Sequence, residues 1–272
     1  MDPVALRIGP LEVRWYGLMY VLGFLAAAMI LRAELIRKGG PVPTSALPEM
    51  TFKAILAVLI GGRLGHVIIY ELAYYLRFPL EVFATWHGGL SFHGGLIGLI
   101  VAGWIWCKRR RVPFLAMADP VALAAVPGIM FAKIGNFING ELVGRVTDLP
   151  WGVVFPHEGP LARHPSQLYE ALLEGPVLFF ILWRVRIKSK IPCGVLAAFL
   201  IGYGALRFLV EFFRQPEPPT GLVLGLLTMG QIWCLGMVVG GIILGFYLRS
   251  QKTVGDIHPL VKPERGCASS DP

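Results

Sequence analysis

Long apolar runs separated by short polar connections dominate the pattern of this chain. Two runs, residues 90–107 and 226–248, contain no Asp, Glu, Lys or Arg and have about the length of roughly 20 residues that a membrane-spanning helix requires. Residues 15–31 form a third uncharged run. Four more runs are equally apolar but carry a few ionisable groups, and they cover residues 54–70, 112–138, 168–183 and 192–213. The pattern predicts an all-α, polytopic membrane protein with seven transmembrane helices.

Basic residues are distributed unevenly among the connections, and this predicts the direction of each span. Lys and Arg cluster after the first, third, fifth and seventh runs, near residues 32–38, 108–111, 184–190 and 249–252. Because Lys and Arg are enriched in short cytoplasmic connections, these four connections are expected on the cytoplasmic side. The N-terminus is therefore expected outside and the C-terminus in the cytoplasm.

The first run has a second interpretation, as a cleaved signal peptide, because Arg7 and Arg14 precede it and residues 26–28 resemble a cleavage site. However, more basic residues follow the run than precede it, and the later spans alternate correctly only if the first is kept. We therefore expect one transmembrane domain that carries the function and a polar cytoplasmic tail, at residues 1–250 and 251–272. The external connections, rich in Gly, Pro and aromatic residues, are expected near residues 71–89, 139–167 and 214–225.

Composition agrees with a membrane protein and narrows its chemistry. Of the 272 residues, 55% are hydrophobic and 15% are charged, so the apolar surface needs lipid as well as a protein core. The net charge of +8 lies mainly in the short connections, so it requires no nucleic-acid partner. The chain contains no His-x-x-x-His or Cys-x-x-Cys spacing, Walker loop or dinucleotide fingerprint. We therefore expect no metal and no cofactor.

Ionisable residues inside spans are costly and are default candidates for function. In the run at 192–213, Tyr203, Arg207 and Glu211 recur every four residues, so a hydroxyl, a guanidinium and a carboxylate share one helical face. Arg214 lies one turn further on. An Arg and a Glu at this spacing also suit a simple neutralising pair that only joins helices. Both interpretations of this stripe are compatible with the spacing.

The end of the run at 112–138 has the densest group of polar residues. Lys133, Asn136 and Asn139 are three positions apart, so a cation and two carboxamides line one helical face. Glu141 and Gly144 follow directly. Paired Asn residues in membrane helices often only hydrogen-bond neighbouring helices. Two amides, a cation, a carboxylate and glycines within a dozen positions exceed that need, which favours a functional site.

His93 opens the run at 90–107 among closely spaced glycines, where another backbone or a lipid headgroup can approach. A lone His on an apolar helix is more often a structural hydrogen-bonder. Arg63 lies in the outer half of the second run, and Tyr16 begins the first. When the predicted span directions are applied, all of these polar groups fall on the outer side. A one-sided cluster suits a reaction on an outer-leaflet lipid, whereas a transporter would place polar residues near the midplane.

These motifs resemble those of the prolipoprotein diacylglyceryl transferase family. The most specific is Gly-Asn-Phe-x-Asn-Gly-Glu-x-x-Gly at residues 135–144. Other matching stretches follow the expected order over nearly the whole chain, at residues 15–20, 61–65, 91–95, 164–170 and 202–216. The resemblance implies an enzyme of the bacterial plasma membrane that transfers a diacylglyceryl group from phosphatidylglycerol to the lipobox cysteine of a prolipoprotein signal peptide. A thioether forms and glycerol phosphate leaves, in the first step of lipoprotein maturation.

The resemblance also implies the residues of the site. Functional family positions correspond to Tyr16, His93, Asn136, Glu141, Gly144, Tyr203, Arg207 and Glu211. The family normally has Arg where this chain has Lys133, which keeps the charge but loses the planar two-pronged donor.

Requirements of the chemistry assign roles to these residues. A thiol is mostly protonated at neutral pH, so we predict that His93 generates the thiolate and that Arg207 stabilises the departing phosphate. Glu211 is predicted to orient the cations, and Tyr203 to hydrogen-bond glycerol hydroxyls or ester carbonyls of the lipid. The residues predicted to bind phosphatidylglycerol are Tyr16, Arg63, Lys133, Asn136, Asn139, Glu141 and Gly144. A transporter and a non-catalytic membrane subunit are the alternatives.

Overall fold

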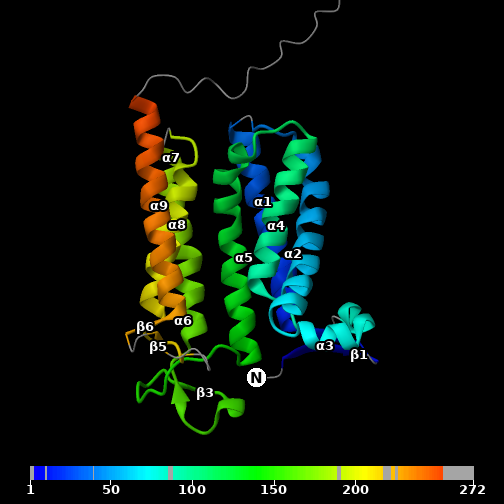
Figure 1. Ribbon diagram of the computed structural model, residues 1–272. Coiled ribbons are helices and arrows are strands. Elements are labelled where there is room, and N and C mark those ends of the chain that lie inside the picture. The colour runs from blue at the N-terminus through cyan, green and yellow to red at the C-terminus, as the bar shows by residue number, and fades with distance from the viewer. Residues whose placement is uncertain are drawn as a thin grey trace, which may run out of the picture.

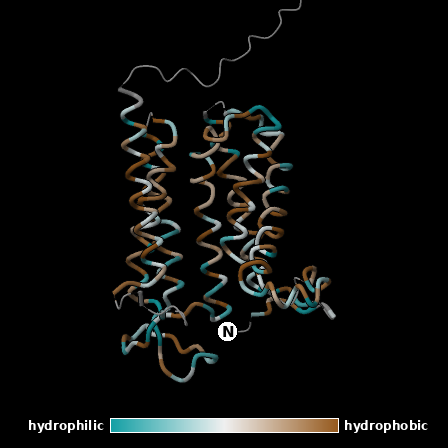
Figure 2. Tube along the Cα trace, in the orientation of Figure 1, coloured by the Kyte–Doolittle hydropathy of each residue, from teal (hydrophilic) through white to brown (hydrophobic). Residues whose placement is uncertain are grey.

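The protein, described by a computed structural model, is a bundle of long helices that run side by side (Figure 1). The structure describes residues 3–9, 11–38, 40–84, 88–188, 191–216, 222–223 and 226–253. The predicted polar tail therefore lies outside the described residues beyond Thr253, and so do parts of the predicted external connections at 71–89 and 214–225. Hydrophobic residues prevail along the helices, whereas hydrophilic ones are concentrated towards the two ends (Figure 2).

The apolar runs form the helices of the bundle. Among the described residues, four helices are long and apolar enough to cross a membrane, α1 (Trp15–Lys38), α2 (Leu47–Ile69), α5 (Ala118–Asn139) and α9 (Met229–Thr253). Shorter apolar helices are α4 (Phe92–Arg109), α6 (Ser166–Leu172), α7 (Leu178–Lys188) and α8 (Gly194–Val210). These elements confirm a mostly helical, polytopic membrane protein. The number of seven spans and their direction across the membrane remain predictions.

The helical run at 168–183 is interrupted at its centre. A π-helical segment, Leu173–Val177, joins α6 to α7, and Gly175 within it has the non-helical angles φ −94° and ψ −108°. Pro176 lacks the backbone donor that a regular helix needs, which accounts for the break. A Cβ on Gly175 would lie 2.8 Å from Cγ of Met130, so this segment packs closely on α5. The interruption begins directly after α6, which carries Glu170, and includes Glu174.

Helix α3 (Leu72–Arg77) and the small sheets gather at one end of the molecule (Figure 1). They were not expected from the apolar pattern, because they are short and built from the connections. The sheets are two-stranded and antiparallel, and are made by β1 (Val4–Ile8) with β2 (Leu11–Arg14), β3 (Val153–Val154) with β4 (Ala162–Arg163), and β5 (Leu222–Val223) with β6 (Leu227–Thr228). The all-α prediction therefore holds for the bundle but misses these sheets.

Glycines allow α2 and α4 to pack backbone against backbone. A Cβ on Gly65 would lie 2.7 Å from the Cα of Gly94, and one on Gly98 would lie 3.1 Å from the Cα of Gly61. Side chains at these positions would force the helices apart. The glycines near His93 thus serve a helix contact, one of the two uses that the sequence suggested.

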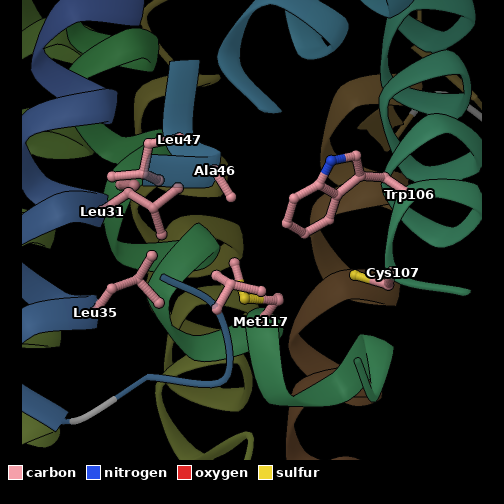
Figure 3. Packing of buried hydrophobic residues seen from close by; sticks show 9 residues of the cluster. Leu31, Leu35, Ala46, Leu47, Trp106, Cys107 and Met117 are labelled. Carbon is pink, nitrogen blue, oxygen red and sulfur yellow. The ribbon is translucent and has the colours of Figure 1, made fainter. Parts of the chain in front are cut away.

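One apolar core cluster lies at the opposite end of the bundle from the small sheets. Residues from α1, α2, α4 and the turn before α5 (Phe114–Met117) pack into one cluster (Figure 3). The cluster includes Leu31, Leu35, Ala46, Leu47, Trp106, Cys107 and Met117, which are between 3% and 6% exposed. At this end α1 is also joined to α7, where Arg186 Nε lies 2.7 Å from Glu34 Oε1. Helices α1, α2 and α4 and the start of α5 are therefore held together far from the polar motifs.

Candidate functional site

Six charged side chains form a buried network between α5, α6 and the end of α8. Glu170 and Glu174 are 0% exposed, and Glu211 and Arg214 are each 6% exposed. A buried charge is costly unless it is paired. The network meets this requirement because it contains three cations and three carboxylates, namely Lys133, Arg207, Arg214, Glu170, Glu174 and Glu211.

Glu170 is the centre of this network. Its Oε2 lies 2.8 Å from Nζ of Lys133, and its Oε1 lies 3.1 Å from Arg207 Nη1 and 3.2 Å from Arg214 Nη1. One carboxylate thus gathers cations from α5 and from the end of α8. Sequence analysis noted Glu170 in a family motif but gave it no role. The signal that could have indicated one is Glu174, four positions later, because two carboxylates on one face of an apolar helix need cations nearby.

Arg207 contacts all three carboxylates. Its Nη1 lies 2.6 Å from Glu211 Oε2, and its Nε lies 3.7 Å from Glu174 Oε1. The neutralising pair that the sequence allowed for Arg207 and Glu211 therefore exists, but it is part of a larger network. Tyr203 lies on the same helix, where its ring stacks on Phe199 at a centroid distance of 5.6 Å. The predicted stripe of α8 thus lies next to Glu170 of α6 and Glu174 of the π-helical segment.

The signature motif at the end of α5 is held by its own turn and by α6. Gly140 ends the helix in the left-handed conformation, with φ +69°, which favours glycine. Asn136 is buried, and Asn139 Nδ2 donates to Glu141 Oε1 at 3.2 Å. The side chain of Gln167 donates to the carbonyl oxygen of Glu141 at 2.5 Å. Three predicted lipid-binding residues are thus within one well-anchored turn beside the ion network.

Gly144 lies where three parts of the chain meet. Its N–H donates to the carbonyl oxygen of His164 at 3.1 Å, and a Cβ on it would lie 2.8 Å from the carbonyl oxygen of Phe213. Arg145 donates from its backbone to Phe213 and from its side chain to the carbonyl oxygen of Arg214 at 3.0 Å. A side chain at position 144 would separate these segments. The glycine therefore fixes the backbone from which Arg214 enters the network.

Tyr16 packs beside the same motif from α1. A Cβ on Gly135 would lie 2.8 Å from Cδ2 of Tyr16, so the ring occupies the space that this glycine leaves open. The hydroxyl groups of Tyr16 and Tyr20 are 3.1 Å apart. The start of α1 and the end of α5 thus meet beside the motif. The sequence predicted that both lie on the same side of the membrane.

His93 lies at the same end of the bundle but apart from the ion network. It is exposed at the start of α4, and its ring lies 5.5 Å from the Phe92 ring and 6.4 Å from the Trp233 ring, between centroids. Trp233 belongs to the first turns of α9. Helices α4 and α9 therefore approach each other here, and an imidazole is available at the surface between them.

Arg63 is buried and fully used by backbone carbonyls. Its Nε donates to Val82, its Nη1 to Gly88 and Gly89, and its Nη2 to Glu81 and Ala84, at 2.6 to 3.3 Å. A guanidinium has five N–H donors, and all five are engaged. This geometry favours a role in holding the loop before α4. Direct binding of phosphatidylglycerol by Arg63 remains a prediction from the sequence.

Comparisons with known proteins agree with the motifs. Residues 3–247 match the family model described as prolipoprotein diacylglyceryl transferase. The chain is 47% identical over 253 residues to the phosphatidylglycerol–prolipoprotein diacylglyceryl transferase of Oleidesulfovibrio alaskensis, which covers 92% of this chain and 95% of that protein. The protein of the same name from Geobacter sulfurreducens is 48% identical over 256 residues, which are 94% of this chain and 98% of that protein.

Proposed function

The chain belongs to the prolipoprotein diacylglyceryl transferase family, and we propose that it transfers the diacylglyceryl group of phosphatidylglycerol to the lipobox cysteine of a prolipoprotein. It is a transferase of lipoprotein maturation. In the reaction the cysteine sulfur bonds to the glyceryl carbon that carries the phosphate. The carbon–oxygen bond breaks, its electron pair stays on the phosphate oxygen, and glycerol phosphate leaves. The thiol proton passes to a base.

The observation that carries this proposal is the group of paired and largely buried cations at one end of the bundle. The departing phosphodiester keeps its negative charge and gains more as the carbon–oxygen bond breaks, so fixed cations lower the barrier. Arg207 is the principal cation, because its guanidinium is held by the carboxylates of Glu211 and Glu170. Lys133 and Arg214 lie around the same carboxylate of Glu170, so two further cations are close to Arg207.

The polar groups around this network have the chemistry to hold the lipid headgroup. Asn136, Asn139 and Tyr203 offer donors and acceptors for glycerol hydroxyls and ester carbonyls. Glu141 lies beside Asn139, and Gly144 keeps the backbone close to the end of α8. Tyr16 contributes an aromatic surface next to α5. These groups form the proposed phosphatidylglycerol site together with Lys133.

His93 is the proposed base for the cysteine thiol. Its imidazole is exposed, so a peptide in the membrane can approach it. A neutral imidazole can take the thiol proton while the sulfur attacks. The His93 ring faces an aromatic neighbour, Trp233, whose apolar surface suits a signal peptide. The thiolate would then form at the same end of the bundle as the cations.

A product assay tests the function. The purified protein, in vesicles containing phosphatidylglycerol, is incubated with a lipobox peptide, and mass spectrometry measures the diacylglyceryl thioether. We expect one glycerol phosphate per thioether, no product from a peptide with Ser in place of Cys, and a strong loss of rate for His93→Gln. Transport of the lipid or peptide without a covalent product would favour a transporter. A wild-type rate for His93→Gln would assign the base to another group.

We also propose that the site end faces the outside of the plasma membrane and that the chain crosses the membrane seven times. The basic ends of α1, α4 and α7 lie at the opposite end of the bundle from the site, which supports this orientation. The test is chemical labelling of a cysteine at position 252 in a variant lacking the native cysteines. We expect labelling only after the membrane is permeabilised. Labelling in intact cells would overturn this orientation.

A further inference from the structure

Helix α9 begins at the site with a reciprocal pair of hydrogen bonds. The N–H of Thr228 donates to Gln231 Oε1 at 3.0 Å, and the N–H of Gln231 donates to Thr228 Oγ1 at 3.1 Å. This is a capping box, which satisfies backbone donors that a helix start leaves open. Both residues are buried, at 5% and 3% exposed. The capping box therefore lies inside the protein, although helix starts are commonly exposed to solvent.

The Thr228 hydroxyl also reaches the ion network. It donates to Oε1 of Glu211 at 2.9 Å. The direction of this bond is fixed, because an ionised carboxylate oxygen can only accept, while the hydroxyl oxygen still accepts from Gln231. A Cβ on Gly230 would lie 2.7 Å from the same Oε1, so the glycine makes room for the carboxylate. The first turn of α9 is thus shaped around Glu211.

The two oxygens of Glu211 have different partners. Oε1 accepts from Thr228, whereas Oε2 lies 2.6 Å from Arg207 and 3.3 Å from Arg214. The hydrogen bond to Oε1 opposes rotation of the carboxylate about its last bond, so its loss gives the carboxylate more freedom to turn. Arg207 could then shift towards Glu170 or Glu174. The hydroxyl therefore restrains the carboxylate that restrains the guanidinium.

We propose that Thr228 is a positioning residue for the transfer reaction, because its hydroxyl orients the Glu211 carboxylate and thereby the Arg207 guanidinium. This inference rests on the proposed function of Arg207. The simpler role of Thr228 is to start α9. The two roles can be separated by experiment. Gln231 belongs to the capping box, and in the part of the chain that the structure describes it has no hydrogen bond to Glu211.

Three variants distinguish positioning from capping. Thr228→Val removes the hydroxyl at equal volume, Thr228→Ser keeps it, and Gln231→Met weakens the cap but keeps the hydrogen bond to Glu211. We expect Thr228→Val to lower kcat about 10-fold, the effect of losing one hydrogen bond to a charged group, with little change in the half-saturating phosphatidylglycerol concentration. Thr228→Ser and Gln231→Met should remain near the wild-type kcat. An equal loss of kcat in Thr228→Val and Gln231→Met, or no loss in Thr228→Val, would overturn the proposal.

A second measurement does not depend on activity. Thermal unfolding in detergent is compared for Thr228→Val, Glu211→Ala and the double variant. Residues in direct contact have non-additive effects, so the double variant should lose less stability than the sum of the single losses. Additive losses would overturn the positioning role of Thr228 and would leave the proposed function of the protein untouched. Coupled losses together with no thioether from the wild type would instead overturn the proposed function, and with it the role of Thr228 in transfer.

Discussion

Two arginines in apolar helices, Arg63 and Arg207, illustrate how the partners of a buried charge decide its role. Both were candidate site residues in the sequence, and both are largely removed from solvent. The side chain of Arg207 is 13% exposed, and the whole residue Arg63 is 6% exposed. Arg63 gives its hydrogen bonds to neutral backbone carbonyls of one loop. Arg207 lies among three carboxylates that come from two helices. A charge inside a span is thus a weak guide to function until its partners are known.

The difference has a chemical consequence. A phosphate could reach Arg63 only by breaking hydrogen bonds that hold the loop before α4. The partners of Arg207 are side-chain carboxylates, and a phosphate oxygen is the same kind of charged acceptor as a carboxylate oxygen. Part of the Arg207 guanidinium can therefore turn from carboxylate to substrate without leaving a backbone group unpaired. We expect Arg207 to act on the lipid and Arg63 to act on the fold.

Replacement of Arg207 tests the catalytic side of this comparison and should have the largest effect. Arg207→Ala removes a cation aimed at a developing anion, and such losses lower the rate by about 10²-fold or more. Turnover is measured with the thioether assay on protein whose insertion and folding are verified. Arg184→Ala, at an exposed arginine of α7, is the control and should retain the wild-type rate. A near-normal turnover of Arg207→Ala would reduce the network to a means of joining helices.

Glu170→Gln should have the second largest effect, because it removes the carboxylate shared by three cations while keeping the shape of the side chain. Each cation loses a charged partner, and a net loss of about 1.5–2 kcal/mol, the lower part of the range for hydrogen bonds to charged groups, lowers kcat about 10- to 30-fold. The three cations are then less neutralised, so the half-saturating phosphatidylglycerol concentration should not rise. A rise in that concentration with constant kcat would show that Glu170 serves lipid binding instead.

The distance along the chain between partners explains what the sequence could and could not predict. The stripe of Tyr203, Arg207 and Glu211 follows from helical spacing, which is local. The partners of Glu170 come from α5 and from the end of α8, so their meeting depends on how the helices pack. The five carbonyls around Arg63 belong to a connection without periodic pattern. The hydrogen bond from Thr228 to Glu211 likewise joins the ends of two helices, α9 and α8.

Arg63→Lys tests the structural side of the comparison. Lys keeps the charge but has three donors where Arg has five, so at least two backbone carbonyls lose a partner, at about 1–3 kcal/mol each. We expect a lower free energy of unfolding in detergent, and an unchanged half-saturating phosphatidylglycerol concentration for the protein that remains folded. Arg32→Lys, at an exposed arginine of α1, is the matched control. Unchanged stability with weaker lipid binding would instead make Arg63 a lipid contact.

Replacement of Lys133 should have the smallest effect on the reaction. Lys133 is a cation of the network, like Arg207, but its expected role is to bind the lipid. The resemblance noted in the sequence implies Arg at this position in the family, where this chain has Lys. Its Nζ is bound to Glu170 at 2.8 Å, and its side chain is 15% exposed, slightly more than that of Arg207. An ammonium acts as a point charge and does not need the two-pronged geometry of a guanidinium. Lys133→Arg should therefore retain activity.

Lys133→Met keeps the length of the side chain and removes the charge, which leaves Glu170 with two cations. Only the lipid carries a phosphate, so the loss should appear as a half-saturating phosphatidylglycerol concentration about fivefold higher, or about 1 kcal/mol, with unchanged peptide affinity. Lys188→Met, at the opposite end of the bundle, controls for the loss of a positive charge. If Lys133→Met lowers kcat and leaves the lipid dependence unchanged, Lys133 acts through Glu170 on Arg207. If neither quantity changes, the ammonium only extends towards the polar boundary, and Arg207 remains the principal cation for the phosphate.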